Sequence, residues 1–125
     1  MTQRTLDQIR GKPCFLVSAD ERGYPHLAAA TVERAEEDLV TVTGWFCPQT
    51  LSNLESNSRV TVAITRSSEG VQLAGQVEER AVEAVMDGFY PTEREVPQAK
   101  FRLAVRVRKA MRLTDRPHSD EALEV

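Results

Sequence analysis

The sequence has few cysteines and no long apolar run. Cys14 and Cys47 are the only two cysteines; they could form one disulfide, but they are too few for a secreted disulfide scaffold. No apolar stretch approaches the roughly 20 residues of a membrane-spanning helix. The N-terminal segment lacks the apolar centre of a signal peptide. We therefore expect a cytoplasmic protein with reduced thiols and no membrane partner.

Positive charge is also scarce. The 16 Lys and Arg residues are outnumbered by 19 Asp and Glu residues, which gives a formal net charge of −3. A nucleic-acid-binding domain is usually more basic, so we expect no nucleic-acid partner. The length of 125 residues suits a single domain, and no repeat or internal linker divides it. We expect one domain over 1–125, with 1–7 and 114–125 as peripheral tails.

Motifs for metal binding and for nucleophilic catalysis are missing. His26 and His118 lie far apart, with no neighbouring ligand at a metal-binding spacing, so we expect no metal site. Cys14 and Cys47 have no identifiable histidine partner, and we interpret both as small core residues. There is no nucleophile elbow and no glycine-rich phosphate loop. The sequence therefore identifies no catalytic residue.

Short apolar or alternating segments dominate what is present. Six of them predict β-strands: Pro13–Ala19, Pro25 to about Arg34, Leu39–Thr43, Arg59–Thr65, Val71–Val77 and Phe101–Leu113. Short turns join the first three, which favours an antiparallel meander. Closing six strands into a small barrel would remove the exposed sheet edges. The fold class is thus mainly β, a six-stranded antiparallel barrel with short helices.

Details within the later strands carry further expectations. Gly75 lies inside a strand, where glycine marks a bulge or a close approach. In the last strand one side carries apolar residues and the other carries arginines, namely Phe101, Leu103, Val105, Val107, Met111 and Leu113 against Arg102, Arg106, Arg108 and Arg112. The arginine side is either a solvated outer face or a surface that draws anionic ligands. Arg102 or Arg106 could then reach a phosphate.

Three segments have helical spacing. Leu6 and Ile9 indicate a short helix before Gly11, and Pro48 suits the first position of a second helix. A third, amphipathic helix ending near Gly88 and Pro91 is predicted by the apolar residues Val82, Val85, Met86 and Phe89. We expect the last two helices to plug or flank the barrel.

The junction from Gly44 to Leu54 is the strongest candidate site. Here a strand ends and the Pro48 helix begins, which leaves the amides of Gln49, Thr50 and Leu51 and the Thr50 hydroxyl open to an anion. The alternative is an ordinary capped helix. Leu51 and Leu54 are expected to face the core, and Thr50, Asn53 and Asn57 to share another face. Trp45 and Phe46 either flank a flat ligand or pack in the core.

Three segments together resemble the pyridoxamine 5′-phosphate oxidase-like superfamily of FMN-binding split barrels. Ala19–Leu27 is similar to its T-x-D-x-x-G-x-P-H hairpin. Thr50–Val60 is similar to its K/T-x-x-N-L-x-x-N-P-R-V segment, and Val71–Val77 to its v-x-v-x-G-x-a strand. The three occur in the family's order, and the short length resembles the small FMN-binding proteins of the superfamily.

The resemblance implies a six-stranded split barrel that forms a homodimer with FMN at the subunit interface. It implies that Ala29, Ala30 and Thr31 pass the isoalloxazine ring. It further implies that the ring or ribityl chain is lined by Thr43, Gly44 and Trp45, and that the phosphate is held by Gln49 and Thr50. Phe89, Tyr90 and the last strand are expected at the dimer interface. Gln49 stands where relatives often carry a basic residue, and this removes a charge-assisted bond worth roughly 1.5–3 kcal/mol.

The resemblance leaves the activity open. The leading interpretation is a flavin-dependent oxidoreductase of unknown substrate, in which the flavin supplies the chemistry. One alternative is a non-catalytic carrier or sensor of flavin, deazaflavin or haem. The other is a dimeric module without a ligand.

Overall fold

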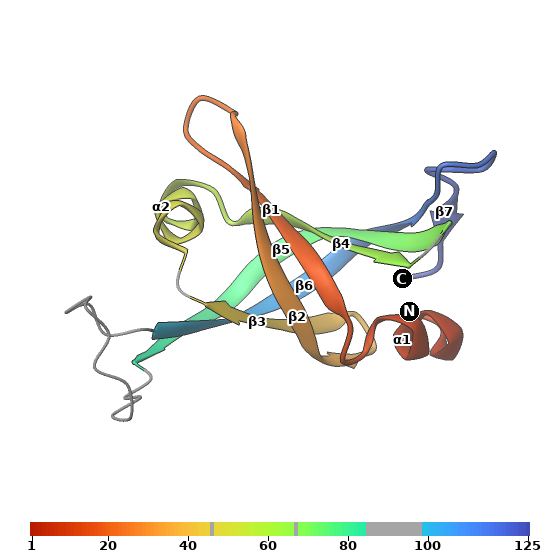
Figure 1. The fold of residues 1–125 in the computed structure, drawn as a ribbon, viewed down its shortest axis with the longest axis horizontal. Coiled ribbons are helices and arrows are strands. Elements are labelled where there is room, and N and C mark those ends of the chain that lie inside the picture. Colours follow the sequence, from red (N-terminus) through yellow and green to blue (C-terminus); the bar gives the residue numbers. More distant parts are fainter. Residues whose placement is uncertain (46, 67, 85–98) are drawn as a thin grey trace.

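In the part of the chain that the structure describes, six antiparallel strands form a closed barrel, with two short helices and a short seventh strand (Figure 1). The computed structural model describes residues 1–45, 47–66, 68–84 and 99–125. The strands are β1 (Pro13–Ala19), β2 (Pro25–Glu36), β3 (Leu39–Trp45), β4 (Arg59–Arg66), β5 (Glu69–Ala84), β6 (Ala99–Leu113) and β7 (Ala122–Leu123). The predicted mainly-β barrel is confirmed.

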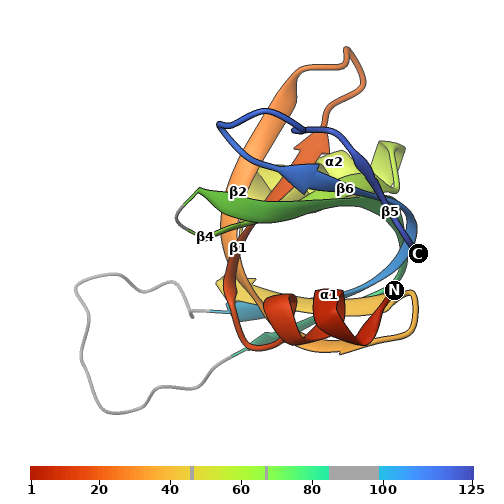
Figure 2. The same ribbon diagram turned by 90° about the vertical axis from the view of Figure 1, so that its right-hand side faces the viewer.

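Pairing between β3 and β6 closes the ring. The strands follow the order β3-β2-β1-β4-β5-β6, and the additional β3–β6 pairing joins the two ends, as the end-on view shows (Figure 2). The predicted meander is present, because β2 pairs antiparallel with both β1 and β3. Val40 and Val42 of β3 lie opposite Val105 and Leu103 of β6, and all four are fully buried.

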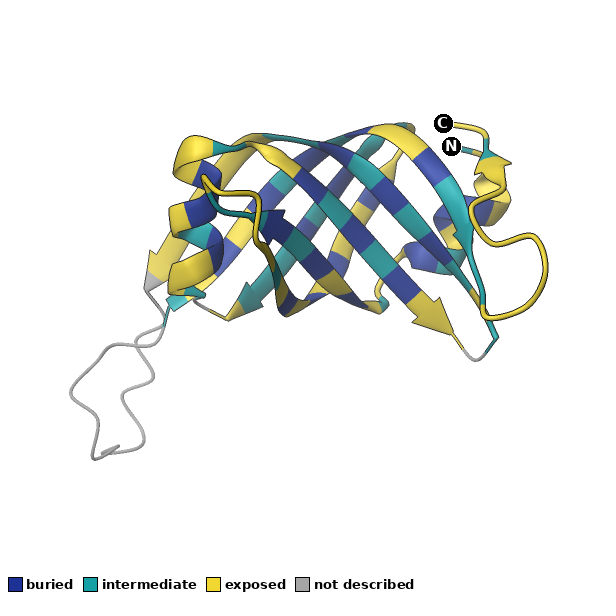
Figure 3. Ribbon diagram, turned by 90° about the horizontal axis from the view of Figure 1, so that it is seen from above, coloured by how far each residue is buried: buried dark blue, intermediate teal, exposed yellow. Residues whose placement is uncertain are grey.

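The core lies inside the ring and follows from the alternation of side chains along each strand. Buried and exposed residues alternate along the strands in Figure 3. In β4 the predicted inward residues Val60, Val62 and Ile64 are all buried. Leu16 of β1 and Leu73 of β5 are completely buried beside them.

Three register shifts interrupt the ladders between the described strands, and each leaves one charged residue without a cross-strand partner in the register. The extra residue is Glu33 in β2, Glu78 in β5 and Arg108 in β6. The shift at Arg108 lies opposite Ala74 and Gly75, so the predicted irregularity at Gly75 is confirmed. An added Cβ at Gly75 would overlap the backbone carbonyl of Arg106.

The shift at Arg108 also changes which residues of β6 face inward. Ala110 is 1% exposed, whereas Met111 and Leu113 are only half-buried. The prediction that Met111 and Leu113 share one side of the strand with Phe101 and Val107 is therefore wrong. An unpaired residue in a strand reverses the alternation that follows it.

The two helices lie at opposite ends of the barrel (Figure 3). Helix α1 (Gln3–Ile9) starts at Thr2, whose hydroxyl accepts a 3.2 Å hydrogen bond from the Thr5 amide. Its Leu6 and Ile9 are buried in the core cluster. Helix α2 (Pro48–Ser56) has Pro48 in its first turn, as predicted.

Both expected tails contact the barrel. The N-terminal ammonium donates a hydrogen bond to the Glu37 carbonyl at 2.9 Å. At the other end, β7 pairs with β6 through Leu123 and Ala110. Within the described ranges, no helix has the length and apolar character needed to cross a membrane.

The third predicted helix is wrong where the structure describes it. Val82 belongs to β5 and lies opposite Phe101 of β6. Its side chain is 50% exposed, so the long β5–β6 ladder, rather than burial of an apolar helix face, fixes this segment. Val85, Met86, Phe89 and Tyr90 lie outside the described residues.

Candidate functional site

A hollow of about 280 Å³ lies where β2, β3 and the start of β6 meet. Its lining is Ala29, Ala30, Thr31, Thr43, Gly44, Trp45 and Lys100. The first six were predicted as cofactor-binding residues, and the structure brings them together. The register explains this, because Thr31 lies opposite Thr43, and Trp45 opposite Lys100.

One wall of this hollow is formed by residues with small side chains or none, namely Ala29, Ala30 and Gly44. A Cβ added at Gly44 would lie 2.8 Å from two ring carbons of Phe101 and 3.2 Å from the Ala29 carbonyl oxygen. Phe101 is 1% exposed and packed in the core, so it cannot easily move away. Glycine at position 44 therefore allows β3 to pass directly over the Phe101 ring. Ala29 and Ala30 add only methyl groups to the wall, which suits a flat ligand.

Trp45 and Lys100 form the charged side of the hollow. The Lys100 ammonium lies 4.9 Å from the centroid of the Trp45 ring, a cation–π contact, and Trp45 is 54% exposed. Lys100 was missed in the sequence because it is far from Trp45 along the chain. Only the closure of β6 onto β3 brings the two together. The hollow therefore contains a cation that Gln49 does not provide.

Gln49 and Thr50 do not line this hollow. The Gln49 side chain is exposed and donates a 2.8 Å hydrogen bond to the Asn53 side-chain oxygen. Cys47 precedes the helix and makes no capping side-chain hydrogen bond. The amides of the first turn therefore lack the side-chain acceptor that usually caps a helix.

The predicted orientation of α2 is wrong for its polar residues. Thr50 is 0% exposed and Asn53 is 2% exposed, whereas Leu51 is only half-buried. Leu54 lies one turn after Thr50, so the face that buries Leu54 buries Thr50 as well. Asn53 is held there by a 3.0 Å hydrogen bond that it donates to the Ser18 hydroxyl.

Thr50 carries an unsatisfied group. Its hydroxyl oxygen is the one buried side-chain polar atom in the described part of the chain with no hydrogen-bond partner. Leaving such a group unpaired costs roughly 1–3 kcal/mol. The sequence predicted a hydroxyl open to an anion, but the structure encloses it in the protein.

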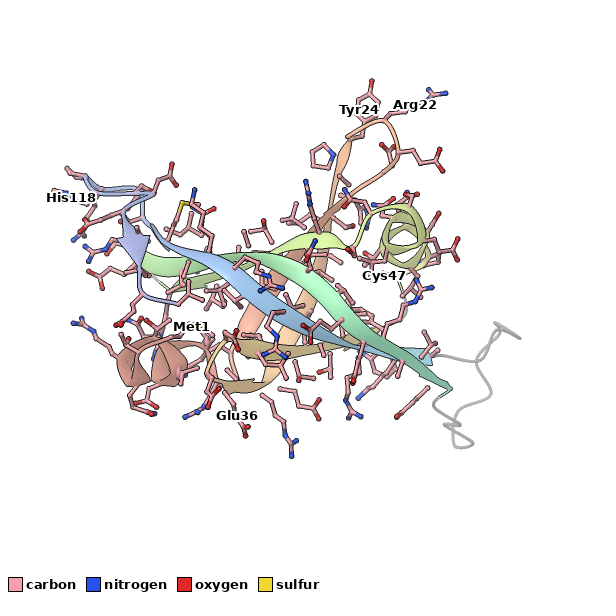
Figure 4. The ribbon with its side chains drawn as sticks, turned by 180° about the vertical axis from the view of Figure 1, so that it is seen from behind. Met1, Arg22, Tyr24, Glu36, Cys47 and His118 are labelled. Carbon is pink, nitrogen blue, oxygen red and sulfur yellow. The ribbon has the colours of Figure 1, made fainter. Side chains whose placement is uncertain are left out.

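The hairpin between β1 and β2 has the geometry that its D-x-x-G-x-P pattern requires. One Asp20 carboxylate oxygen accepts hydrogen bonds from the amides of Arg22 (2.8 Å) and Tyr24 (2.9 Å). Gly23 adopts φ +84°, a conformation that glycine reaches without strain. The tip projects away from the barrel with Arg22 and Tyr24 at its end (Figure 4).

Two of the four arginines predicted on one side of β6, Arg102 and Arg106, are paired with carboxylates. Arg102 forms two hydrogen bonds with Glu33, at 2.9 and 3.1 Å. Arg106 binds Asp38 at 2.7 Å and Glu78 at 2.9 and 3.0 Å. These bonds lower the pKa of the Asp38 and Glu78 carboxyls and raise the pKa of Arg106. Neither Arg102 nor Arg106 lines the hollow beside Lys100.

Both cysteines are free thiols, as predicted. Burial raises the pKa of Cys14 to about 11 and also raises that of Cys47. The Cys47 thiol donates a 3.2 Å hydrogen bond to the Trp45 carbonyl. A nucleophilic cysteine needs a lowered pKa, so neither thiol is activated. Among the described residues, no group of three or more His, Cys, Asp or Glu side chains could hold a metal ion.

A second hollow of about 400 Å³ adjoins the first, since Ala29 and Ala30 line both. Phe15 lies opposite Ala29 on β1 and is 40% exposed, and Leu27 on the same strand as Ala29 is 56% exposed. The outer side of the β1–β2 pair therefore presents an apolar surface next to the first hollow.

Comparison with known proteins identifies the fold. No protein-family model matches the chain, and no curated protein sequence matches it. Among solved structures, HupZ from group A Streptococcus superposes with a TM-score of 0.64 at 17% identity, covering 96% of this chain and 98% of HupZ. An F420 reductase gives a TM-score of 0.60 at 15% identity, with 86% and 94% coverage.

A third neighbour is described by its cofactor. The pyridoxamine 5′-phosphate oxidase-related, FMN-binding protein of Nostoc punctiforme gives a TM-score of 0.58 at 10% identity, covering 89% of this chain and 81% of that one. Similar structures span almost the whole chain at low identity, so the likeness is one of fold. This chain has the split-barrel fold of the pyridoxamine 5′-phosphate oxidase-like FMN-binding proteins.

Proposed function

We propose that this chain is an FMN-binding protein that carries out flavin redox chemistry on a small substrate. The observation that carries the proposal is the hollow at the β2–β3–β6 junction. It gathers six residues that the sequence resemblance assigned to the cofactor, and it adds the cation Lys100. The solved structures that share the fold include FMN-binding proteins.

The residues fit the parts of FMN. The flat ring system would lie against the shallow wall of Ala29, Ala30 and Gly44, with Trp45 at its edge. Lys100 would offset the negative charge of the phosphate or of the reduced ring. The flavin supplies the redox chemistry when it is bound, and the protein binds it, orients it and shields it from water. Thr50 would contribute its hydroxyl only if α2 moves, because the hydroxyl is enclosed.

The proposal includes a second subunit. A volume of about 280 Å³ is at or below the small end of ligand sites, which occupy about 300–1,000 Å³, so one chain supplies only part of the cavity. The exposed Phe15 and Leu27 lie beside the hollow and would be covered in a homodimer. The second subunit would then complete the cofactor site.

A deazaflavin is the alternative ligand that one observation favours. An F420 reductase is among the structures with the same fold, and F420 is a deazaflavin. Its flat ring system would pack against the same wall of Ala29, Ala30 and Gly44. The two ligands are told apart by which one the purified protein retains or takes up.

The visible spectrum of the purified protein is the first test. We expect flavin absorption and release of FMN on heating; a colourless protein that also fails to take up added FMN or F420 would refute the proposal. Sedimentation of the loaded protein should give the mass of a dimer. Reduction of the bound flavin by a nicotinamide donor, followed by reoxidation by an acceptor, would distinguish an enzyme from a carrier.

Lys100→Gln tests the site itself. Removing a charge-assisted contact should weaken FMN binding by about tenfold, measured by quenching of flavin fluorescence. Lys109→Gln is the matched control, because Lys109 is an exposed lysine of the same strand that lines none of the hollows described here. Equal affinity of the two variants would exclude Lys100 from the site. Gln49→Lys should tighten binding only if the phosphate lies at the start of α2.

A further inference from the structure

A larger hollow, of about 510 Å³, lies on another part of the barrel wall. It crosses four adjacent strands, from Val17 on β1 through Thr61 on β4 and Ala74 on β5 to Arg108 on β6. It shares no lining residue with the hollow beside Lys100. Its volume is within the range of about 300–1,000 Å³ that small-molecule sites occupy.

The charge of this hollow has one sign. Arg59 and Arg108 line it, and no Asp or Glu is among the described residues of its lining. Within the described part of the chain, neither arginine lies within 4.0 Å of a carboxylate oxygen. Arg102 and Arg106, by contrast, both have close carboxylate partners. Both Arg59 and Arg108 are exposed, so a ligand in the hollow could reach both guanidinium groups.

The irregularity of β6 places one of these arginines. Arg108 is the extra residue of the register shift, so it has no cross-strand partner in the ladder, and it is exposed on the outer side of β6. Glu78 and Asp38 influence Arg108 only at longer range, because Arg106 holds both carboxylates by hydrogen bonds. Gly75, opposite the shift, also lines the hollow.

Further donors and an apolar wall complete the hollow. The Asn57 side-chain oxygen accepts a 3.0 Å hydrogen bond from the Arg59 amide, which leaves the Asn57 amide group as a donor. Gln76 lies opposite Arg59 across the β4–β5 ladder and also lines the hollow. Val17, Ala19 and Pro25 provide an apolar wall.

We propose that this hollow is a second binding site, for a small organic anion whose phosphate or carboxylate group is held by Arg59 and Arg108. Arginine binds both groups through paired hydrogen bonds. The apolar body of the ligand would pack against Val17, Ala19 and Pro25. The site is independent of the flavin proposal, because it shares no residue with that hollow.

Titration with three matched probes tests this site: phenyl phosphate, benzoate and the neutral benzyl alcohol. We expect saturable binding of at least one anion in ¹⁵N NMR spectra, with the largest amide shifts at Thr61, Gly75 and Gln76, and much weaker binding of benzyl alcohol. The stronger of the two anions identifies the group that the site prefers. The titration is run on the protein as purified and again after saturation with FMN, so the result does not depend on the flavin site.

Variants decide whether the two arginines are responsible. Each of Arg59→Gln and Arg108→Gln should weaken binding of the anion about tenfold, and Arg108→Lys should weaken it less. The control is Arg34→Gln, an exposed arginine outside every hollow described here. Circular dichroism checks that each variant is folded. Absence of saturable binding, equal binding of benzyl alcohol, shifts confined to the Lys100 hollow, or an equal loss in Arg34→Gln would overturn the proposal.

Discussion

Gly75→Ala should be strongly destabilising, because β5 and β6 lie too close together there to leave room for a side chain. An added Cβ would overlap the Arg106 carbonyl oxygen and lie 2.9 Å from its carbonyl carbon and 3.1 Å from a methyl carbon of Val105. The first two obstacles are backbone atoms, so they cannot rotate away. Strand β5 must therefore separate from β6 at this point.

The cost follows from these contacts. Overpacking a well-packed interior costs about 1–3 kcal/mol, and each ladder hydrogen bond lost as the strands separate adds about 1 kcal/mol. Arg106 would also move relative to Asp38 and Glu78, which it now contacts at 2.7 and 2.9 Å. We expect Gly75→Ala to lower the free energy of unfolding by about 3 kcal/mol.

Urea unfolding followed by far-ultraviolet circular dichroism measures this loss. The control is Gly23→Ala, because nothing lies within 4 Å of a Cβ at Gly23 and only its φ of +84° disfavours alanine. That backbone penalty alone is about 1–2 kcal/mol. If Gly75→Ala lost no more stability than Gly23→Ala, the close approach of β5 and β6 would not be the constraint that we infer.

Three further changes test the interior and the ion cluster. Thr50→Val replaces the unpaired buried hydroxyl by a methyl group and should stabilise the flavin-free protein by about 1 kcal/mol in urea unfolding; a loss would show that the hydroxyl has a partner. Asn53→Ala should lower the free energy of unfolding by about 1–3 kcal/mol, because it leaves the Ser18 hydroxyl without its partner. The control Ser52→Ala, at an exposed neighbouring residue, should change it little. Arg106 lowers the folded-state pKa of Asp38 and Glu78 below their usual 3.8 and 4.5, so the stability they contribute is complete above those values and is lost as the pH falls through the lowered pKa values. Acid titrations of Arg106→Gln should show a flatter loss of stability than the wild type, and an unchanged slope would contradict the assignment.

The strands could be predicted from the sequence because their signals are local. Strand β1 has the predicted bounds Pro13–Ala19, since an apolar run there meets a turn signal at Asp20. Strand β5 could not be predicted in full. Its continuation to Ala84 depends on pairing with β6, which is a long-range contact. The local sequence suits a helix equally well, because Val82, Val85 and Met86 are spaced at helical intervals.

The placement of α2 residues required tertiary information. The sequence shows that Pro48 begins a helix, but the direction of that helix relative to the sheet decides which face is buried. Contact with β1 through Asn53 and Ser18 turns Thr50 inward. Their polarity alone predicted that Thr50 and Asn53 would face away from the core. Asn53 can be buried because its side chain donates a hydrogen bond to Ser18 and accepts one from Gln49.

Both proposed sites depend on the register of β6, which no short segment encodes. Pairing with β3 places Lys100 opposite Trp45, and the register shift opposite Gly75 places Arg108 at the other hollow. Lys100 and Arg108 are eight residues apart, so both lie on the outer side of β6, where regular alternation puts them. The extra residue in β6 changes the alternation after Arg108, so that Ala110 joins Phe101, Leu103, Val105 and Val107 in the core.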